Sequence, residues 1–403
     1  MNCRSQRLKE FIDLGEQPNG NNFLFPEEAE DQLFFELKML VCLDCWEVQI
    51  DEFPSPEFMF SNHPYISGVN VPVVRHFNSL AVRVVDKLEL EENSLVIDVG
   101  CNDGSLLRAF ERCGMRTLGV DPGKRTGELA RKQGKVVFET FFSEKTGKAL
   151  SELGIRPDVV TATAVFYHIP DLHDFVRGLN WLMTDESVFV VQCVGIRDLI
   201  QKNEFDHFYH EHSCIHGVSP LKRLFEEFGL KIFDVEHSEI HGGSFILYVA
   251  KLENKAVIEP SVDEYIESEK SAGLDNFDTY WAFSERVGHN AGAVKSFLQE
   301  LKANGKSVYA LGAPVKGSTF LNFAGIDSDL VSCATEVNEF KIGRLVPGTS
   351  IPVVDESVLE QMPDYFLVLS WNFLDFLVEK YDDYLRSGGK FIVGVPELRV
   401  IER

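Results

Sequence analysis

The stretch FDHFYHEHSCIHG, residues 205–217, concentrates groups that exchange protons or bind metals near neutral pH. It holds four of the chain's eleven histidines, together with Tyr209 and Glu211. Histidine titrates close to neutral pH and is also a common metal ligand, so the stretch is a candidate for proton transfer or metal binding. Side chains alternate along an extended strand, which would point Tyr209 and His212 to opposite faces. A bend is therefore required if these two side chains act on the same substrate atoms.

Two other interpretations of these histidines remain open. A metal site that includes His207 and Glu211 would indicate metal-dependent chemistry, because imidazole and carboxylate are both metal ligands. Alternatively, His207, His210 and His216 only support the fold or face solvent.

A second candidate site is VIDVGCNDGSLL, residues 96–107, which has the form of a strand, a glycine turn and the start of a helix. Gly100 and Gly104 would let a ligand approach the backbone closely at the carboxyl end of the strand. Asp121 ends the next predicted strand, where a carboxylate suits the two hydroxyls of a ribose. Asp98 and the turn backbone could hold a cationic amino-acid end.

These features together fit S-adenosylmethionine (SAM), which carries a sulfonium, an amino acid and an adenosine. The predicted cofactor contacts are Asp98, Gly100, Asn102, Gly104 and Asp121. The glycine spacing differs from the Gly-x-Gly-x-x-Gly that suits a pyrophosphate, which disfavours a nicotinamide-dependent reductase. The remaining alternative is a structural glycine turn without a ligand.

Three cysteines near the N-terminus form a candidate zinc site. Cys42 and Cys45 make a C-x-x-C unit, and Cys3 stands in a second turn-rich segment. Small domains with paired cysteines often close around zinc, which replaces a missing core. Gln6 occupies the position where a second C-x-x-C would end, so one of the four usual ligands is missing.

Strands and helices alternate around the cofactor turn. An amphipathic helix is predicted at 75–90, strands at 95–100, 116–121, 158–165 and 188–194, and helices at 105–114 and 126–134. This alternation predicts a doubly wound α/β domain, with a parallel sheet covered by helices on both faces. Residues 1–62 are rich in turn formers and are predicted to be irregular.

A second α/β pattern follows a helical connector. A capping box at Ser261-Val-Asp-Glu264 is predicted to open the connector, which ends at Ala303-Asn304-Gly305. Beyond it, strands are predicted at 307–313, 330–337, 365–371 and 390–395, with helices at 317–325 and 372–385.

Basic and polar residues gather in two loops of this second half. Lys316, Ser318 and Asn322 belong to the first loop and helix, and Lys341 and Arg344 follow in NEFKIGR. Such cations suit a diphosphate. A pair of solvated loops is the alternative.

Composition narrows the class of protein. The chain has 403 residues, a hydrophobic share of 44% and a formal net charge of −24. That charge argues against a broad nucleic-acid surface, which requires clustered Lys and Arg. No run of 18 apolar residues predicts a membrane span, and the N-terminus lacks the apolar region of a signal peptide. We therefore expect a cytoplasmic protein without nucleic-acid or membrane partners, whose cysteines are reduced or bound to metal.

Several motifs in combination resemble those of the SAM-dependent sugar C-methyltransferases. This family acts on nucleotide-linked 4-keto deoxysugars, as in tetronitrose, mycarose and vancosamine biosynthesis. The resemblance spans the whole chain through VCLDCWEVQ, VIDVGCNDGSLL, FYHIPDL (166–172), YHEH (209–212), HGGS (241–244), GAPVKGSTFLNFAGI (312–326) and LVPGTSIPV (345–353). One departure is Ala164-Val165, which stands where the family has Asn-Val.

The resemblance implies a three-part chain. We expect a small zinc-binding-type domain at 1–62, a SAM-binding methyltransferase domain at 63–255, a helical connector at 256–304 and a Rossmann-like domain at 305–403. The metal ligands would be Cys3, Cys42 and Cys45. His241 of HGGS would join the basic residues of the C-terminal half in binding the substrate, a nucleotide-diphosphate deoxysugar.

The resemblance also implies catalytic residues. The YHEH motif carries Tyr209, Glu211 and His212 into the active site, and HIPDL carries His168. An active-site tyrosine maps to Tyr65 in HPYISG, with His63 as the alternative.

Our hypothesis is that His212 removes the C3 proton of the sugar. Tyr209 and His168 would then bind the C4 oxygen, and Glu211 would orient or tune a histidine. The competing functions are a metal-dependent sugar O-methyltransferase and a non-catalytic nucleotide-sugar binding protein.

Overall fold

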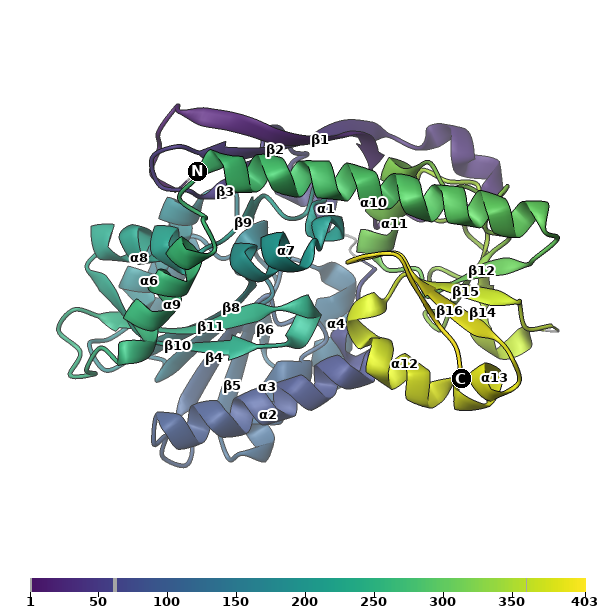
Figure 1. Ribbon diagram of the computed structural model, residues 1–403. Coiled ribbons are helices and arrows are strands. Elements are labelled where there is room, and N and C mark those ends of the chain that lie inside the picture. The colour runs from purple at the N-terminus through teal and green to yellow at the C-terminus, as the bar shows by residue number, and fades with distance from the viewer. Residues whose placement is uncertain (1, 61–63, 360) are drawn as a thin grey trace.

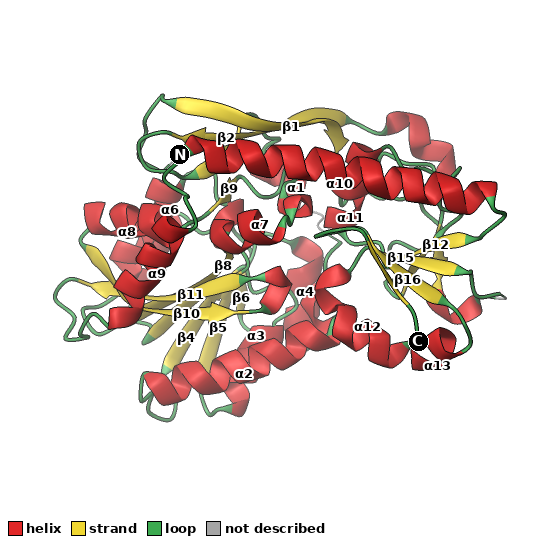
Figure 2. Cartoon of the chain, in the orientation of Figure 1, coloured by secondary structure: helices red, strands yellow, loops and turns green. Residues whose placement is uncertain are grey.

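The computed structural model describes residues 2–60, 64–359 and 361–403, which form three β-sheets (Figures 1 and 2). The expected domain boundary at residues 62 and 63 falls outside the described residues. The long helix α10 (Phe277–Ala303) crosses the top of the view in Figure 1, alongside β1, and reaches both lobes of the molecule. Within the described part of the chain, no helix combines the length and apolar character that a membrane crossing requires.

The N-terminal segment forms an antiparallel sheet, so the expectation of an irregular region was wrong. Its strand order is β1-β2-β3-β9, with bounds Leu8–Pro18, Phe34–Cys42, Val48–Ile50 and Cys214–Ile215. Register shifts interrupt the β1–β2 pairing between Glu10 and Ile12 and between Asp13 and Glu16. Such bulges break the alternation from which a strand is recognised in a sequence. Short helices accompany the sheet: η1 (Pro26–Asp31), α1 (Pro56–Phe60) and η2 (Ser67–Val69).

The middle sheet has seven strands in the order β10-β11-β8-β7-β4-β5-β6. The bounds are β4 Leu95–Val99, β5 Arg116–Val120, β6 Val137–Phe138, β7 Val159–Thr163, β8 Val188–Val194, β10 Leu230–Ser238 and β11 Ser244–Lys251. The strands from β6 to β8 are parallel, whereas β11 pairs antiparallel with both β8 and β10. This is the doubly wound α/β domain that the alternating pattern predicts, with an antiparallel hairpin added at one edge.

Helices cover this middle sheet. They are α2 (Val71–Lys87), α3 (Ser105–Arg112), α4 (Lys124–Lys132), α5 (Glu144–Glu152), α6 (Leu172–Leu182) and α8 (Val218–Glu227). Helix α7 (Ile196–Lys202) instead packs into the core between the N-terminal sheet and the C-terminal half. The short 3-10 helices are η3 (Phe166–His168), η4 (Phe205–His207) and η5 (Ile240–Gly242). The FYHIPDL motif begins with η3, η5 overlaps the start of HGGS, and η4 precedes YHEH.

The connector consists of two helices, α9 (Pro260–Ser271) and α10. The predicted capping box at Ser261 is wrong, because α9 begins one residue earlier and the Ser261 hydroxyl donates to Asp234. The Asn276 side chain caps α10, which ends at Ala303 before Asn304 and Gly305, as predicted. With about 1.5 Å per residue, its 27 residues span roughly 40 Å.

The C-terminal sheet has six strands in the order β14-β13-β12-β15-β16-β17. Their bounds are β12 Val308–Leu311, β13 Ala334–Glu336, β14 Val353–Asp355, β15 Tyr365–Val368, β16 Lys390–Val393 and β17 Arg399–Ile401. The helices are α11 (Val315–Ala324), α12 (Leu374–Lys380) and α13 (Asp382–Arg386), with η6 (Glu356–Val358) and η7 (Trp371–Phe373). The order 3-2-1-4-5-6 with parallel strands up to β16 is that of a Rossmann fold, as expected.

One hydrophobic core joins the N-terminal sheet to the C-terminal half. Phe11 of β1 packs against Phe208, Tyr280 and Phe283, and the last two belong to α10. Further along α10, Val294 and Leu298 belong to the same buried cluster as the strands of the C-terminal sheet. Phe208 belongs to this core and Cys214 to the core of the middle sheet, so the histidine-rich stretch is anchored where all three sheets meet.

Candidate active site

The turn after β4 has the conformation that its glycines predict. Gly100 and Asn102 adopt left-handed φ values of 74° and 51°. The Gly100 N–H donates to the Val120 carbonyl at 2.7 Å, which joins the turn to the end of β5. Asp121 accepts hydrogen bonds from the N–H groups of Asn102 and Gly123, each at 2.8 Å. The carboxylate is thereby fixed at the carboxyl edge of the sheet, where it can accept hydrogen bonds from the hydroxyls of a ribose.

A cavity of about 350 Å³ opens beside this turn, and Gly100, Asn102 and Asp121 line it. The described lining residues do not include Asp98 or Gly104. Asp98 is buried and accepts a hydrogen bond from the Thr161 hydroxyl at 2.7 Å, while Gly104 precedes α3 with a φ of 78°. Burial raises the pKa of Asp98 to about 7. These two residues therefore support the turn, and the other three present their atoms to a ligand.

The backbone bends sharply at YHEH. The His212 N–H donates to the Tyr209 carbonyl at 2.8 Å, which closes a tight turn. As a result the Tyr209 and His212 rings lie 3.9 Å apart between centroids. Both side chains line a second cavity of about 490 Å³. The turn supplies the bend that an extended strand lacks.

The His212 imidazole is held in one tautomer. Its Nδ1 lies 2.7 Å from the carbonyl oxygen of His207, and a carbonyl only accepts, so the proton is on Nδ1. Its Nε2 has no hydrogen-bond partner among the described residues, although the side chain is only 1% exposed. Burial and the neighbouring His168 and His207 hold the pKa of His212 well below its usual range. A neutral imidazole with a bare Nε2 lone pair is the form that accepts a proton.

The other residues expected to be catalytic gather around His212. His168 ends η3 and stacks on His212, with ring centroids 5.2 Å apart. Glu211 accepts a hydrogen bond from Asn21 Nδ2 at 2.6 Å, so a loop of the N-terminal sheet reaches the site. Tyr65 also lines the larger cavity. His63, the alternative to Tyr65, lies outside the described residues.

The three remaining histidines of the stretch are held by the fold. His207 Nε2 lies 2.9 Å from the His241 carbonyl, His210 Nε2 lies 3.1 Å from the Glu36 carbonyl, and His216 Nδ1 lies 2.5 Å from a carboxylate oxygen of Glu47. Over residues 2–60, 64–359 and 361–403, the only group placed to hold a metal is the cysteine cluster. The described residues thus give no support to a metal site on His207 and Glu211.

The two cavities share part of their walls. Tyr65, Ala164, His168 and His241 line both of them. Ala164 has a φ of 58°, a left-handed conformation that costs a non-glycine residue about 1–2 kcal/mol. A ligand held at the cofactor turn and a ligand beside His212 would therefore meet at this common wall.

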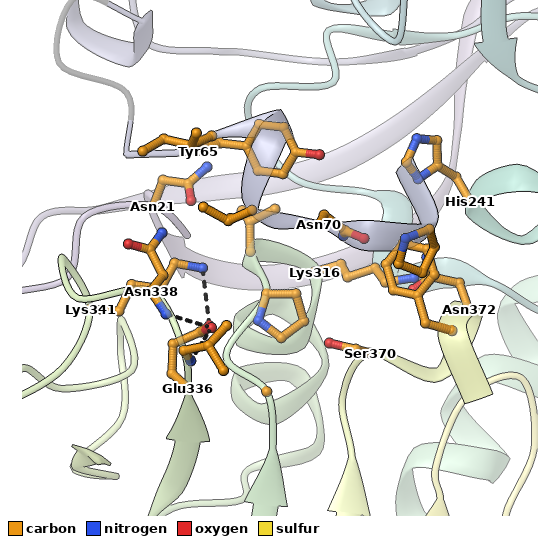
Figure 3. A pocket seen from close by; sticks show the side chains of 18 of the residues that line it. Asn21, Tyr65, Asn70, His241, Lys316, Glu336, Asn338, Lys341, Ser370 and Asn372 are labelled. Atoms are coloured by element: carbon orange, nitrogen blue, oxygen red, sulfur yellow. Dashed lines mark hydrogen bonds and ion pairs between the residues drawn. The ribbon is translucent and has the colours of Figure 1, made fainter. Parts of the chain in front are cut away.

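The larger cavity lies between the middle sheet and the C-terminal half. Figure 3 shows Glu336, Asn338 and Lys341 grouped at one end, and His241, Lys316 and Asn372 at the other. Lys316 is 7% exposed, its Nζ lacks a hydrogen-bond partner among the described residues, and it lies 3.8 Å from the centroid of the Trp371 ring. Burial lowers the pKa of Lys316, while Asp206 and Glu204 oppose that shift.

Three of the predicted substrate contacts do not line this cavity. The Ser318 hydroxyl and Asn322 Nδ2 both donate to the Pro347 carbonyl at 3.0 Å. Arg344 donates to the Phe23 carbonyl at 2.9 Å. These residues hold loops together, because their polar atoms are already used by the backbone. Of the six predicted contacts, His241, Lys316 and Lys341 are the ones that face the cavity.

Sequence reasoning missed several polar residues of the larger cavity. They are Asn21, Asn70, Glu336, Asn338, Ser370 and Asn372. Glu336 had a detectable signal, since it ends the second strand of the second α/β half as Asp121 follows the second strand of the first. Asn21 had none, because it lies 190 residues from Glu211.

The cysteine cluster fits a zinc ion. The Sγ atoms of Cys3, Cys42 and Cys45 all lie within 4.8 Å of one another, and those of Cys3 and Cys42 are 3.5 Å apart. Two thiolates on a tetrahedral zinc at 2.3 Å would be separated by about 3.8 Å. Gln6 is exposed. The three thiolates therefore form three corners of a structural site on the N-terminal sheet, separate from the cavities.

Three family models match consecutive parts of the chain. Residues 2–60 match the "Putative zinc binding domain", residues 74–235 the "Methyltransferase domain", and residues 239–396 the "C-methyltransferase C-terminal domain". The order of the three models follows the three sheets.

Similar proteins differ in how much of the chain they match. The C-methyltransferase NovU of Streptomyces niveus is 29% identical over 401 residues, which are 99% of this chain and 96% of NovU. A ubiquinone biosynthesis O-methyltransferase of Azorhizobium caulinodans is 26% identical over 126 residues, 30% of this chain and 47% of that enzyme. The structure of magnesium protoporphyrin IX methyltransferase from Synechocystis PCC 6803 with bound SAM aligns with a TM-score of 0.35 and 17% identity, over 45% of this chain and 81% of that one. Only the first of these three similarities extends through all three sheets.

Proposed function

Because the chain is a SAM-dependent C-methyltransferase, we propose that it methylates C3 of a nucleotide-linked 4-keto deoxysugar. The observation that carries the proposal is the pair of cavities with a common wall, one at the cofactor turn and one beside His212. When bound, SAM supplies an electrophilic methyl group that reacts with a carbon nucleophile. The protein must therefore create that nucleophile beside the wall.

A carbon next to a ketone becomes nucleophilic when it loses a proton. In our proposal the Nε2 lone pair of His212 takes the C3 proton, and the electrons of the C–H bond move to the C4 oxygen as an enolate. The donation from Nδ1 to the His207 carbonyl keeps the imidazole in the tautomer that this step needs. SAM held by Gly100, Asn102 and Asp121 would supply the methyl group to this carbon, with its sulfur as the leaving group.

The developing charge on the C4 oxygen needs hydrogen-bond donors. The Tyr209 hydroxyl is a suitable donor, since burial and nearby Glu211 hold the pKa of Tyr209 well above its usual range and keep it protonated. His168, stacked on His212, is the second donor in the proposal. Asn21 donates a hydrogen bond to Glu211, and the charge of the Glu211 carboxylate contributes to the raised pKa of Tyr209.

Two features of the larger cavity support a nucleotide sugar over a smaller ketone. Its volume of about 490 Å³ is within the range of sites for drug-sized ligands. The buried ammonium groups of Lys316 and Lys341 line it, and they suit a diphosphate in a chain whose net charge is −24. Lys341 also donates to the Ala313 carbonyl at 2.8 Å, which fixes its position.

The test is incubation of the protein with methyl-labelled SAM and a panel of nucleotide-linked 4-keto deoxysugars. We expect one labelled methyl group on a sugar carbon, located at C3 by fragmentation in the mass spectrometer. Label on a sugar oxygen, or no labelled sugar with any member of the panel, would contradict the proposal. Reactions without sugar nucleotide control for methylation of the protein itself.

A further inference from the structure

The C-terminal half repeats the arrangement that surrounds Asp121. Gly100 and Gly312 each follow the first strand of their sheet, and their φ values are 74° and 81°. Each glycine donates its N–H to the carbonyl of the residue before an acid: Gly100 to Val120 at 2.7 Å, and Gly312 to Thr335 at 3.0 Å. The acids are Asp121 and Glu336, at the carboxyl ends of the two second strands.

The hydrogen bonds to the two carboxylates also correspond. Asp121 accepts one hydrogen bond from Asn102 N in the loop after the first strand. It accepts another from Gly123 N, two residues after Asp121 itself. Glu336 accepts from its first loop through Ala313 N at 3.3 Å, and from Asn338 N, again two residues further along, at 3.2 Å. Each carboxylate accepts a further hydrogen bond from its own half, Asp121 from the Thr126 hydroxyl at 3.0 Å and Glu336 from Val337 N at 2.8 Å.

Both acids face a cavity. Asp121 lines the cofactor cavity and Glu336 lines the larger one, together with Gly312 and Ser370 from the ends of neighbouring strands. In open α/β sheets ligands bind at the carboxyl ends of the strands, where the strand order reverses. In the C-terminal sheet that point lies between β12 and β15, which end beside Gly312 and Ser370.

We infer that Glu336 accepts hydrogen bonds from the pentose hydroxyls of the substrate's nucleoside, as Asp121 suits the ribose of the cofactor. The inference rests on the proposed function, because it assigns the nucleoside of a nucleotide-linked substrate to the C-terminal half. Glu336 lies at the end of the cavity opposite His241, and His241 also lines the cofactor cavity (Figure 3). The nucleoside thus lies at the carboxyl edge of the C-terminal sheet, across the cavity from His241.

The cations of the cavity agree with this direction. Lys341 Nζ lies 3.6 Å from a carboxylate oxygen of Glu336, and Lys316 lies at the opposite end (Figure 3). A diphosphate between the nucleoside and the sugar would extend from the first lysine toward the second. A competing role for Glu336 is structural only, because its bonds to Ala313 N and Asn338 N also brace two loops.

The experiment is a thermodynamic cycle between the carboxylate and the hydroxyls, measured by calorimetry on the full chain with bound SAM. The probe is the tightest binder among UDP, CDP, GDP and dTDP, compared with its 2′,3′-dideoxy analogue. In the wild type we expect loss of the hydroxyls to weaken binding about 10- to 100-fold, as for hydrogen bonds to a charged group. Glu336→Gln should weaken binding of the hydroxylated nucleotide by a similar factor, with little further loss for the dideoxy analogue.

Glu356→Gln is the matched control. Glu356 is another acid that lines the same cavity, and it forms an ion pair with Lys380 at 2.5 Å. It does not lie at the end of the strand beside the Gly312 turn. This variant should keep the wild-type preference for hydroxylated nucleotides. Unchanged melting and SAM affinity in Glu336→Gln would show that the loops around Glu336 remain folded.

If Glu336→Gln and removal of the hydroxyls weaken nucleotide binding independently of each other, the inference is overturned and Glu336 only braces the two loops. So would failure of all four nucleotides to bind a folded protein that binds SAM. Both results are binding measurements and do not depend on turnover. Failure of the proposed function is detected separately, by the labelled-methyl panel. If the affinity losses are coupled but the labelled-methyl panel yields no methylated sugar, the nucleoside site is retained and the proposed sugar substrate is rejected.

Discussion

Replacement of His212 tests the proposed base, and the structure offers a variant that preserves its surroundings. The imidazole makes one described hydrogen bond, from Nδ1 to the His207 carbonyl, and Nε2 has none among the described residues. His212→Asn places an amide N–H near the Nδ1 position and removes Nε2. His212→Ala removes both and leaves the carbonyl without a partner, at a cost of about 1–3 kcal/mol in unfolding free energy.

The two variants should therefore agree in catalysis and differ in stability. Removal of a general base typically costs about 10²- to 10⁴-fold in rate, so we expect both to lose methyl transfer by such a factor. Affinity for SAM should be retained, because His212 does not line the cofactor cavity. Only His212→Ala should unfold more easily in denaturant.

The decisive assay is exchange of the substrate's C3 proton with deuterated water, followed by mass spectrometry in parallel with single-turnover methyl transfer. Exchange should fall together with methyl transfer in both variants, because both steps need the same base. Exchange at the wild-type rate in His212→Asn would refute the reasoning, and His168 or Tyr65 would be the next candidate. His210→Ala serves as a control, since His210 is bonded to the Glu36 carbonyl and does not line either cavity.

Four further predictions follow from the same geometry. The pKa of His212 lies well below its usual value of about 6.5, so its base form persists as the pH falls through 6.5; an acid limb in the pH–rate profile at or above 6.5 would contradict this. Asp121→Ala should weaken SAM binding about tenfold or more in calorimetry while the fold survives, and unchanged affinity would remove Asp121 from the ribose site. Metal analysis should find about one zinc per chain, lost in a variant with Cys42→Ser and Cys45→Ser, and a metal-free wild type would mean that three thiolates do not suffice. Ala164→Gly should raise the unfolding free energy by about 0.5–1 kcal/mol by relieving a φ of 58°, whereas the same change at Ala149 on helix α5 should lower it.

Local patterns explain what was predictable. The cofactor turn and Asp121 lie within a short segment where each glycine or acid follows a strand, so spacing alone placed them at one edge of a sheet. The Rossmann-like half was predictable for the same reason, because its strands are short and separated by helices. The long helix before it ends at Ala303, directly before Asn304 and Gly305, as these terminating residues predicted.

Long-range contacts explain what was not predictable. No sequence pattern indicates that His212 N–H would close a turn on Tyr209, since that turn depends on packing where three sheets meet. Asn21 reaches Glu211 across 190 positions of sequence. Ser318, Asn322 and Arg344 had suitable chemistry for a ligand, but their polar atoms are used by backbone carbonyls that only the fold brings near. The N-terminal sheet was missed because its first strand is bulged.

The wall common to the two cavities has a thermodynamic consequence. A ligand that shifts Tyr65, His168 or His241 on one side changes the shape offered to the ligand on the other. Linkage then requires reciprocity: whatever factor the cofactor contributes to substrate affinity, the substrate contributes to cofactor affinity. The same holds after turnover, when the demethylated cofactor and the methylated product would share the wall. Each product therefore changes the affinity of the protein for the other, and inhibition by one product depends on the concentration of the other.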